Sequence, residues 1–300
     1  MSLKIFLLGG TKDSINIIRF LKEKSLKENF LKEQFLKEQT FNDSVSPYIL
    51  NTTTTDYGAE IAKSAGADKV IAKPLPKEEI IAILNDDSFD VLIDATHPFA
   101  TSITASAIES AKIANIPYIR FERPLLSEFN IKNSKLYQVD SFQEAGKIIA
   151  NNYSDIYSDL KILHLAGVNT IEPVLEYLDS YDLKNNFYVR VLPVESSIRK
   201  CRSLGINGDH IIAIQGTFSK NFNKAIMKEF NADIIITKNS GAIGGLPSKL
   251  EAADELGIAI ILVNPPKIAE LEEKKEKEEE KVIVNDLNQL KAKLKDLLEI

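Results

Sequence analysis

The segment 91–100, VLIDATHPFA, places an acid, a hydroxyl and an imidazole directly after an apolar run. Asp94, Thr96 and His97 therefore stand where a strand is expected to end and a helix to begin. Open α/β sheets bind ligands beyond the carboxyl ends of their strands, so this corner is a candidate site. An imidazole titrates near neutral pH and serves in proton transfer or in binding. The alternative is a strand end whose polar residues only cap the turn.

Two glycines follow the first expected strand. Gly9 and Gly10 precede Thr11 at the start of an expected helix. Glycines at such a turn let the backbone approach a phosphate, and the helix N-terminus supplies N–H donors and the positive end of its dipole. The pattern is not the GxGxxG fingerprint, so alone it is a weak indication of a dinucleotide.

The second expected strand ends in hydroxyl residues. Segment 51–55 reads NTTTT and finishes at Thr55. NAD-binding proteins usually carry an Asp or Glu there, which holds the ribose 2′-hydroxyl. Hydroxyls accept a 2′-phosphate without repelling it, so the segment favours NADP. The alternative is that the threonines reflect β propensity alone.

The second half of the chain carries three glycine corners, each after an expected strand, at 165–170, 215–219 and 237–245. The last, TKNSGAIGG, joins a hydroxyl, an ammonium and an amide to three glycines, and Lys249 follows it. These groups suit an anion cradle. Each corner alone could be a turn chosen for its backbone conformation, but three in one domain favour a ligand site.

Short apolar runs alternate with helical stretches along the whole chain, which predicts βαβ units and mainly parallel sheets. The first strand series is 3–8, 47–52, 68–72, 90–94 and 116–121, and the second is 135–139, 160–165, 186–192, 210–214, 232–237 and 258–263. We therefore expect an α/β protein with two domains, at 1–124 and 135–300, and an interdomain cleft. The polar stretch 125–135 is expected to link them.

Two segments are interpreted as charged insertions without chemistry, at about 25–46, where Leu-Lys-Glu recurs, and at about 269–281. The segment after the second insertion predicts a last short strand and an amphipathic helix. These final elements are included in the second domain.

Composition narrows the classes of function. The chain has 300 residues, a formal net charge of −6 and one cysteine, Cys201. We expect no disulfide framework and no protein metal site, which fits a reducing cytoplasm. The N-terminal segment lacks the long apolar run expected of a signal peptide or membrane span, and the acidic balance argues against nonspecific nucleic-acid binding. The sequence leaves the oligomeric state open.

The order of motifs resembles the precorrin-6A reductases of cobalamin biosynthesis, which include the cobalt-precorrin-6A reductases. The resemblance covers about residues 4–266 without the Leu-Lys-Glu insertion and rests on DATHPFA, RFERP and TKNSG.GG..K. It implies two Rossmann-like domains with the cofactor and a macrocycle in the cleft. It also implies NADPH-dependent reduction of one ring double bond in a corrin precursor, with any cobalt arriving inside the substrate.

The resemblance implies roles for individual residues. His97 is the candidate catalytic residue, as a proton donor or only as a binding residue, since solvent or the substrate could also deliver the proton. Asp94 would orient His97 or cap the following helix. The expected cofactor contacts are Gly9, Gly10, Thr11, Thr55, Thr96, Gly216, Thr237, Lys238, Ser240 and Gly241. The expected contacts to the polycarboxylate substrate are Arg120, Arg123, Arg190, Gly244, Gly245 and Lys249.

Other interpretations stay open at this point. Arg120 and Arg123 could instead form interdomain salt bridges with Glu122 or other acids. The chain departs from the family pattern at Thr217, at Asn264 and in the corner 165–170. The alternative functions are a nucleotide- or S-adenosylmethionine-dependent transferase and a non-catalytic tetrapyrrole- or nucleotide-binding protein. Ligand choice distinguishes the three functions.

Overall fold

The computed structural model of the chain describes residues 3–23, 46–86, 88–126, 128–153, 159–178, 186–241, 244–268, 271 and 281–298. It divides into two compact units, Met1–Pro124 with Lys267–Ile300, and Leu125–Pro266. Both expected insertions lie almost wholly outside the described residues. Among the described helices, none is long and apolar enough to cross a membrane.

Unit 1 is built on a six-stranded sheet in which every neighbouring pair is parallel. The strand order is β3-β2-β1-β4-β5-β12. The strands are β1 (Lys4–Leu8), β2 (Tyr48–Thr53), β3 (Lys69–Ala72), β4 (Val91–Asp94), β5 (Tyr118–Phe121) and β12 (Lys281–Val284). The helices that the structure describes are α1 (Lys12–Lys22), α3 (Asp56–Ala65), α4 (Lys77–Asp86), α5 (Thr101–Ala114) and α12 (Leu287–Leu298).

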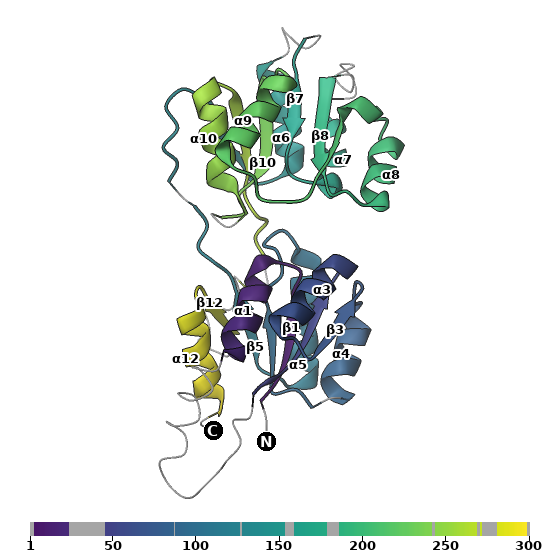
Figure 1. Cartoon of the computed structure of the whole chain (residues 1–300), viewed down its shortest axis with the longest axis vertical. Helices are drawn as coiled ribbons and strands as arrows, with labels where there is room; N and C mark the ends of the chain where they lie inside the picture. The colour runs from purple at the N-terminus through teal and green to yellow at the C-terminus, as the bar shows by residue number, and fades with distance from the viewer. Residues whose placement is uncertain are drawn as a thin grey trace, which may run out of the picture. The chain divides into compact units, whose positions relative to one another are not determined.

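Both faces of this sheet are covered, which explains why its strands are continuous apolar runs. Successive strand residues point to opposite faces. Ile5 and Leu7 of β1 join α1, α3 and α12 in one core cluster, and Phe6 and Leu8 join α4 and α5 in another. The sheet is thus the middle of three layers, as Figure 1 lets the reader follow.

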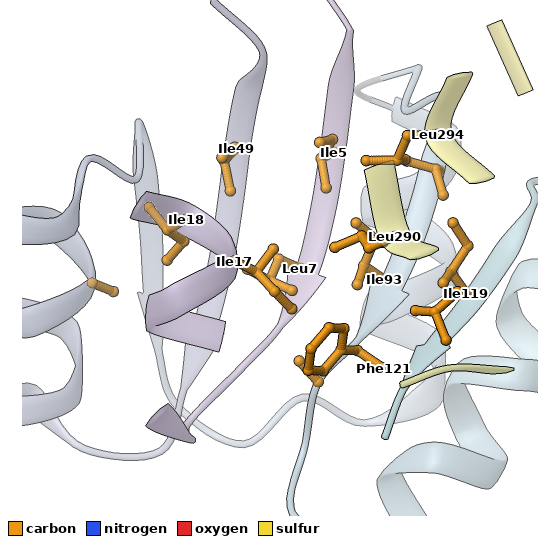
Figure 2. Packing of buried hydrophobic residues seen from close by; sticks show 14 residues of the cluster. Ile5, Leu7, Ile17, Ile18, Ile49, Ile93, Ile119, Phe121, Leu290 and Leu294 are labelled. Atoms are coloured by element: carbon orange, nitrogen blue, oxygen red, sulfur yellow. The ribbon is translucent and has the colours of Figure 1, made fainter. Parts of the chain in front are cut away.

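The C-terminal segment belongs to unit 1, so its assignment to the second domain was wrong. β12 pairs in parallel with β5. Leu290 and Leu294 of α12 are fully buried against the sheet, beside Ile93 and Ile119 in Figure 2. The sequence predicts a strand and an amphipathic helix here, but strand pairing is set by which sheet edge is open, and that information is not local.

Unit 2 repeats this architecture. Its sheet has the order β6-β11-β10-β7-β8-β9, again with every neighbouring pair parallel. The strands are β6 (Leu136–Val139), β7 (Ile162–His164), β8 (Phe187–Val191), β9 (Ile211–Ala213), β10 (Ile234–Lys238) and β11 (Ala259–Val263). The described α-helices are α6 (Phe142–Asn152), α7 (Glu172–Leu175), α8 (Glu195–Ser203), α9 (Lys220–Glu229) and α10 (Leu246–Leu256). α9 and α10 lie side by side and cover one face (Figure 1).

The stretch expected to be a linker packs on unit 2 instead. Leu126, Phe129 and Ile131 lie against its apolar core. The carboxylate of Asp254 accepts hydrogen bonds from three successive backbone N–H groups, those of residues 132–134. The second compact unit therefore begins at Leu125 rather than at 135.

Candidate functional site

The carboxyl edge of the unit 1 sheet brings two sequence motifs together. The strand order reverses between β1 and β4, which is the place where doubly wound sheets bind dinucleotides. Gly9, Gly10 and Thr11 follow β1, and segment 95–97 follows β4. The Thr11 hydroxyl donates to the carbonyl of Ala95 at 2.7 Å, so the two loops are joined.

The two glycines of the loop after β1 have different structural roles. A Cβ on Gly9 would collide with the carbonyl oxygen of Thr52, 2.7 Å away, and with the Asn51 side chain, so Gly9 lets the loop lie against β2. Gly10 has a φ of +92°, and a Cβ there would meet only Thr53, at 3.9 Å. Gly10 is exposed and leaves room beside the backbone. The open space needed for a phosphate is therefore at Gly10.

Two predicted cofactor hydroxyls cap helices. Thr11 accepts from the backbone N–H of Ser14 at 3.2 Å and forms a capping box with it at the start of α1. Thr55 accepts from the backbone N–H of Gly58 at 3.1 Å and caps α3. A hydroxyl has one donor and two acceptor sites, and Thr11 already donates to Ala95, so only an acceptor site is left to it.

Asp94 is the centre of a buried polar network. Its Oδ1 accepts from the backbone N–H and the hydroxyl of Thr96, at 2.9 and 2.7 Å, and pairs with Nη1 of Arg120 at 2.8 Å. Its Oδ2 accepts from the hydroxyl of Tyr118 at 2.9 Å, and burial together with Asp94 raises the pKa of Tyr118 well above its ordinary value. Helix α5 has no side-chain cap at Ala100. Asp94 thus orders the start of the 95–99 loop rather than capping the helix.

The structure places Arg120 and Arg123 in ion pairs with acids of unit 1 itself. Arg120 is 1% exposed and contacts Asp94, Glu122 and Thr96. Burial opposes its charge, but the acids outweigh it and raise its pKa. Nε of Arg123 lies 2.6 Å from Oδ1 of Asp13. The geometry therefore favours a structural role for Arg120, whereas Arg123 is about one-third exposed and accessible to a ligand.

His97 is half-buried, and a backbone donor orients its ring. The N–H of Phe99 donates to Nδ1 of His97 at 3.2 Å, and the two rings lie 5.7 Å apart. An acceptor Nδ1 places the proton of the neutral imidazole on Nε2. Nε2 of His97 is therefore the ring nitrogen that carries the donor N–H.

Unit 2 has its own switch point, between β7 and β10. The glycine corner that begins at Leu165 follows β7, and Lys238 ends β10. His164 is fully buried, its Nε2 lies 2.9 Å from the hydroxyl of Thr170, and burial and the charge of Lys238 lower its pKa to about 3. His164 is therefore a buried imidazole that stays neutral near pH 7. His210 lies in the 3₁₀ turn η5 (Gly208–His210) before β9, with its ring 4.4 Å from that of Tyr188.

Three predicted binding cations gather at this edge. Nζ of Lys249 donates to the hydroxyl of Thr237 at 3.1 Å. Nη1 of Arg190 donates to the side-chain oxygen of Asn223 at 3.0 Å, and its guanidinium lies 5.1 Å from the ring centroid of Phe218. Lys238 lies over the ring of Phe142 at 5.7 Å.

The surroundings of these three cations disfavour their charged forms. Burial, together with the nearby charges of Arg190 and Lys238, lowers the pKa of Lys249 to about 7. Burial lowers the pKa of Lys238 to about 8 and that of Arg190 to about 10. Perturbed groups at a strand-end corner are typical of functional sites.

The glycines near these cations shape the loops. Gly241 and Gly245 have φ values of +70° and +73°, and Gly245 precedes α10. A Cβ on Gly244 would collide with the side chain of Ser240. Gly216 has a φ of +152° and lies against the Phe218 ring. Conformation and close packing thus explain these glycines, whether or not they also contact a ligand.

Sequence reasoning missed Tyr118 and Asp13 as partners of the candidate site. Alternation along a strand puts Tyr118 on the same face as Arg120. A strand buried on both faces needs an acid or hydroxyl to satisfy such an arginine. Asp13 lies in the first turn of α1, where an acid is also favoured by the helix dipole, so its pairing with Arg123 had no distinctive signal.

Comparison with known proteins agrees with the two-sheet architecture. The family model "Precorrin-6x reductase CbiJ/CobK" matches residues 39–293. The cobalt-precorrin-6A reductase of Methanothermobacter thermautotrophicus is 40% identical over 217 residues, 72% of this chain and 68% of its own. That of Methanocaldococcus jannaschii is 34% identical over 266 residues, 89% and 92% of the two chains. A solved structure titled CobK precorrin-6A reductase has a TM-score of 0.65 at 16% identity, covers 99% of this chain and 98% of its own, and shares the fold.

Proposed function

This chain belongs to the precorrin-6x reductase family, and we propose that it reduces one ring double bond of cobalt-precorrin-6A with hydride from NADPH. The observation that carries the proposal is the similarity to cobalt-precorrin-6A reductases over most of the chain, at 34% identity over 89% of it for one relative. The same relatives support an oxidoreductase over a transferase or a carrier. The metal-free macrocycle precorrin-6A is the other substrate to be tested.

The carboxyl edge of the unit 1 sheet, at the β1–α1 turn and the end of β2, fits a dinucleotide. Gly10 is exposed, has a positive φ and leaves open space at the β1–α1 turn, beside the N-terminus of α1. The β2 strand ends in hydroxyl residues, of which Thr54 is exposed. We place the pyrophosphate at Gly10 and the 2′-phosphate near Thr54 and Thr55, an arrangement that favours NADPH over NADH.

When bound, NADPH supplies the hydride, and the chain supplies position and electrostatics. The Asp94–Arg120 pair holds the backbone N–H and hydroxyl of Thr96, so the 95–99 loop is fixed before a ligand arrives. Fixed geometry is what brings reacting groups to near-attack distance, and it accounts for much of the barrier reduction in reactions of this kind.

His97 is better suited to bind than to donate the proton. Its Nδ1 accepts from the Phe99 N–H. Protonation of the ring would put a second N–H at Nδ1 and break that bond. We therefore assign to His97 a hydrogen bond from Nε2 to an oxygen of the cofactor or macrocycle. Solvent or another acid supplies the proton.

Turnover tests the proposal. Purified protein is mixed with NADPH or NADH and with either macrocycle, and cofactor oxidation is followed together with the absorbance of the macrocycle. We expect reduction with NADPH and slower or weaker use of NADH, because the 2′-phosphate adds charge-assisted hydrogen bonds of roughly 1.5–3 kcal/mol. Folded protein that binds NADPH but reduces neither macrocycle would refute the assignment.

A further inference from the structure

The side chain of Asn223 lies where β8, the β9–α9 loop and α10 meet. It is in the first turn of α9 and is 2% exposed. Its Oδ1 accepts from Nη1 of Arg190 on β8 at 3.0 Å. Its Nδ2 lies 3.2 and 3.0 Å from the carbonyl oxygens of Phe218 and Ser219, and 3.3 Å from the hydroxyl of Ser248 on α10. One buried amide therefore joins the strand, the loop and the second helix.

The chemistry of these partners requires an amide at this position. A guanidinium only donates hydrogen bonds and a carbonyl oxygen only accepts them, so the side chain between them must offer an acceptor on one side and a donor on the other. A carboxylate of the same size offers acceptors alone, and an apolar side chain offers neither. The partners also fix the orientation of the amide, because the reverse orientation would set its NH₂ group against the guanidinium.

Asn223 holds Arg190 in place without neutralising it. Within the part of the chain that the structure describes, no acid pairs with Arg190, and its guanidinium lies over the Phe218 ring at 5.1 Å. Burial lowers the pKa of Arg190 to about 10, so the guanidinium is charged at neutral pH. It has five N–H donors, of which the bond to Asn223 uses one. The neutral amide therefore fixes the guanidinium and leaves its charge to a ligand.

We propose that Asn223 is a positioning residue, which acts through Arg190 and holds its guanidinium ready for one carboxylate of the macrocycle. This role rests on the proposed function for its ligand, a corrin precursor that carries several carboxylates. A guanidinium and a carboxylate form two parallel hydrogen bonds, and these depend on orientation. Ordering a long side chain at the moment of binding costs affinity. Asn223 orders Arg190 before the ligand arrives, so this cost is avoided.

A double-mutant cycle on ligand affinity separates positioning from a structural role. The Kd of cobalt-precorrin-6A is measured by calorimetric titration without NADPH, so no turnover takes place. Arg190→Met should raise this Kd roughly 10–100-fold, because it removes a charge-assisted hydrogen bond. Asn223→Ala should raise it roughly five- to tenfold in the wild type but less than about twofold in the Arg190→Met background. A side chain that only stabilises the loop would give the same factor in both backgrounds.

The matched control is Asn221→Ala, which removes an exposed asparagine from the same turn of α9. It should change the Kd of the macrocycle by less than about twofold. The Kd of NADPH, which we place in unit 1, should also stay within about twofold in every variant. Thermal unfolding confirms that each variant is folded at the assay temperature. If Asn223→Ala is unfolded, Asn223→Ser takes its place in the cycle with the same expected pattern.

Steady-state kinetics gives a second measurement of the positioning role. With NADPH saturating, Asn223→Ala should raise the KM for the macrocycle by a factor similar to that for the Kd, and kcat should change less than about threefold. A contact to a carboxylate remote from the reacting bond is made equally in the ground state and the transition state, so its loss appears in KM. A fall in kcat at unchanged KM would contradict a role in binding.

The outcomes distinguish this role from the proposed function. An unchanged Kd in Asn223→Ala or in Arg190→Met, or an equal loss from Asn223→Ala in both backgrounds, overturns the positioning role. If turnover is found without the predicted cycle, the proposed function stands and the positioning role fails. If the cycle is found but NADPH does not reduce the bound macrocycle, the positioning role stands and the proposed function fails.

Discussion

Replacing Arg120 by methionine should destabilise unit 1 strongly. The guanidinium is 1% exposed and faces the Asp94 carboxylate, which is fully buried, at 2.8 Å. Methionine leaves Asp94 with the hydrogen bonds from Thr96 and Tyr118 but without its countercharge. A buried charge that loses its partner costs about 3–5 kcal/mol.

Urea unfolding followed by far-UV circular dichroism measures the effect. The matched control is Arg199→Met, which removes an exposed arginine that pairs with Glu195 on α8 and should cost less than about 1 kcal/mol. Asp94→Asn combined with Arg120→Met should cost less than the sum of the single variants, because the two residues interact directly. A loss below about 1 kcal/mol for Arg120→Met, or additive single variants, would refute the buried-pair argument.

Three further predictions concern individual residues. Lys249→Met should stabilise the ligand-free protein at pH 6 by up to about 5 kcal/mol. The gain should shrink toward pH 10.5, because the depressed pKa of Lys249 makes the stability of the wild type rise with pH between 7 and 10.5. Thermal unfolding at pH 6 and 9.5 measures the gain, and equal gains at the two pH values would contradict the prediction. Thr11→Ala should cost about 2 kcal/mol in urea unfolding, since it loses a helix cap and the bond to Ala95, whereas Ser219→Ala loses only an exposed cap and should cost about 1. Gly9→Ala should destabilise the fold by about 1–3 kcal/mol because the Cβ meets the Thr52 carbonyl. Gly10→Ala has room for its Cβ, but the φ of +92° strains an alanine, so this variant should both lower the melting temperature and weaken NADPH binding.

Local patterns predicted most of the strands and helices of this fold, because each apolar run and each amphipathic stretch carries its own period. They did not predict the partner of β12, since pairing with β5 joins residues more than 150 positions apart. Nor did they predict that 125–134 packs on unit 2. There the anchors are three spaced apolar residues in a polar stretch, with Asp254 supplied from far along the chain.

The sequence indicated where the candidate site residues lie in the fold better than it indicated what their side chains do. Residues at strand ends were found from the sequence, but a hydroxyl after a strand serves equally as a helix cap or as a ligand contact. Thr11 and Thr55 are caps in the structure. The extent of burial distinguishes Arg120 from Arg123, because Arg120 lies in a strand that is covered on both faces. The gathering of Arg190, Lys238 and Lys249 depends on the strand order β10-β7-β8, which the sequence does not state. A cleft shared by the two domains stays a prediction.

Isotope transfer tests the central claim most directly. The protein is incubated with cobalt-precorrin-6A and with NADPH carrying deuterium at one or the other face of the nicotinamide C4, and the macrocycle is analysed by mass spectrometry. The account predicts that one labelled form, and only one, delivers a single deuterium to the macrocycle, while the second added hydrogen comes from solvent. A reduced macrocycle without deuterium from either form would contradict direct hydride transfer from NADPH.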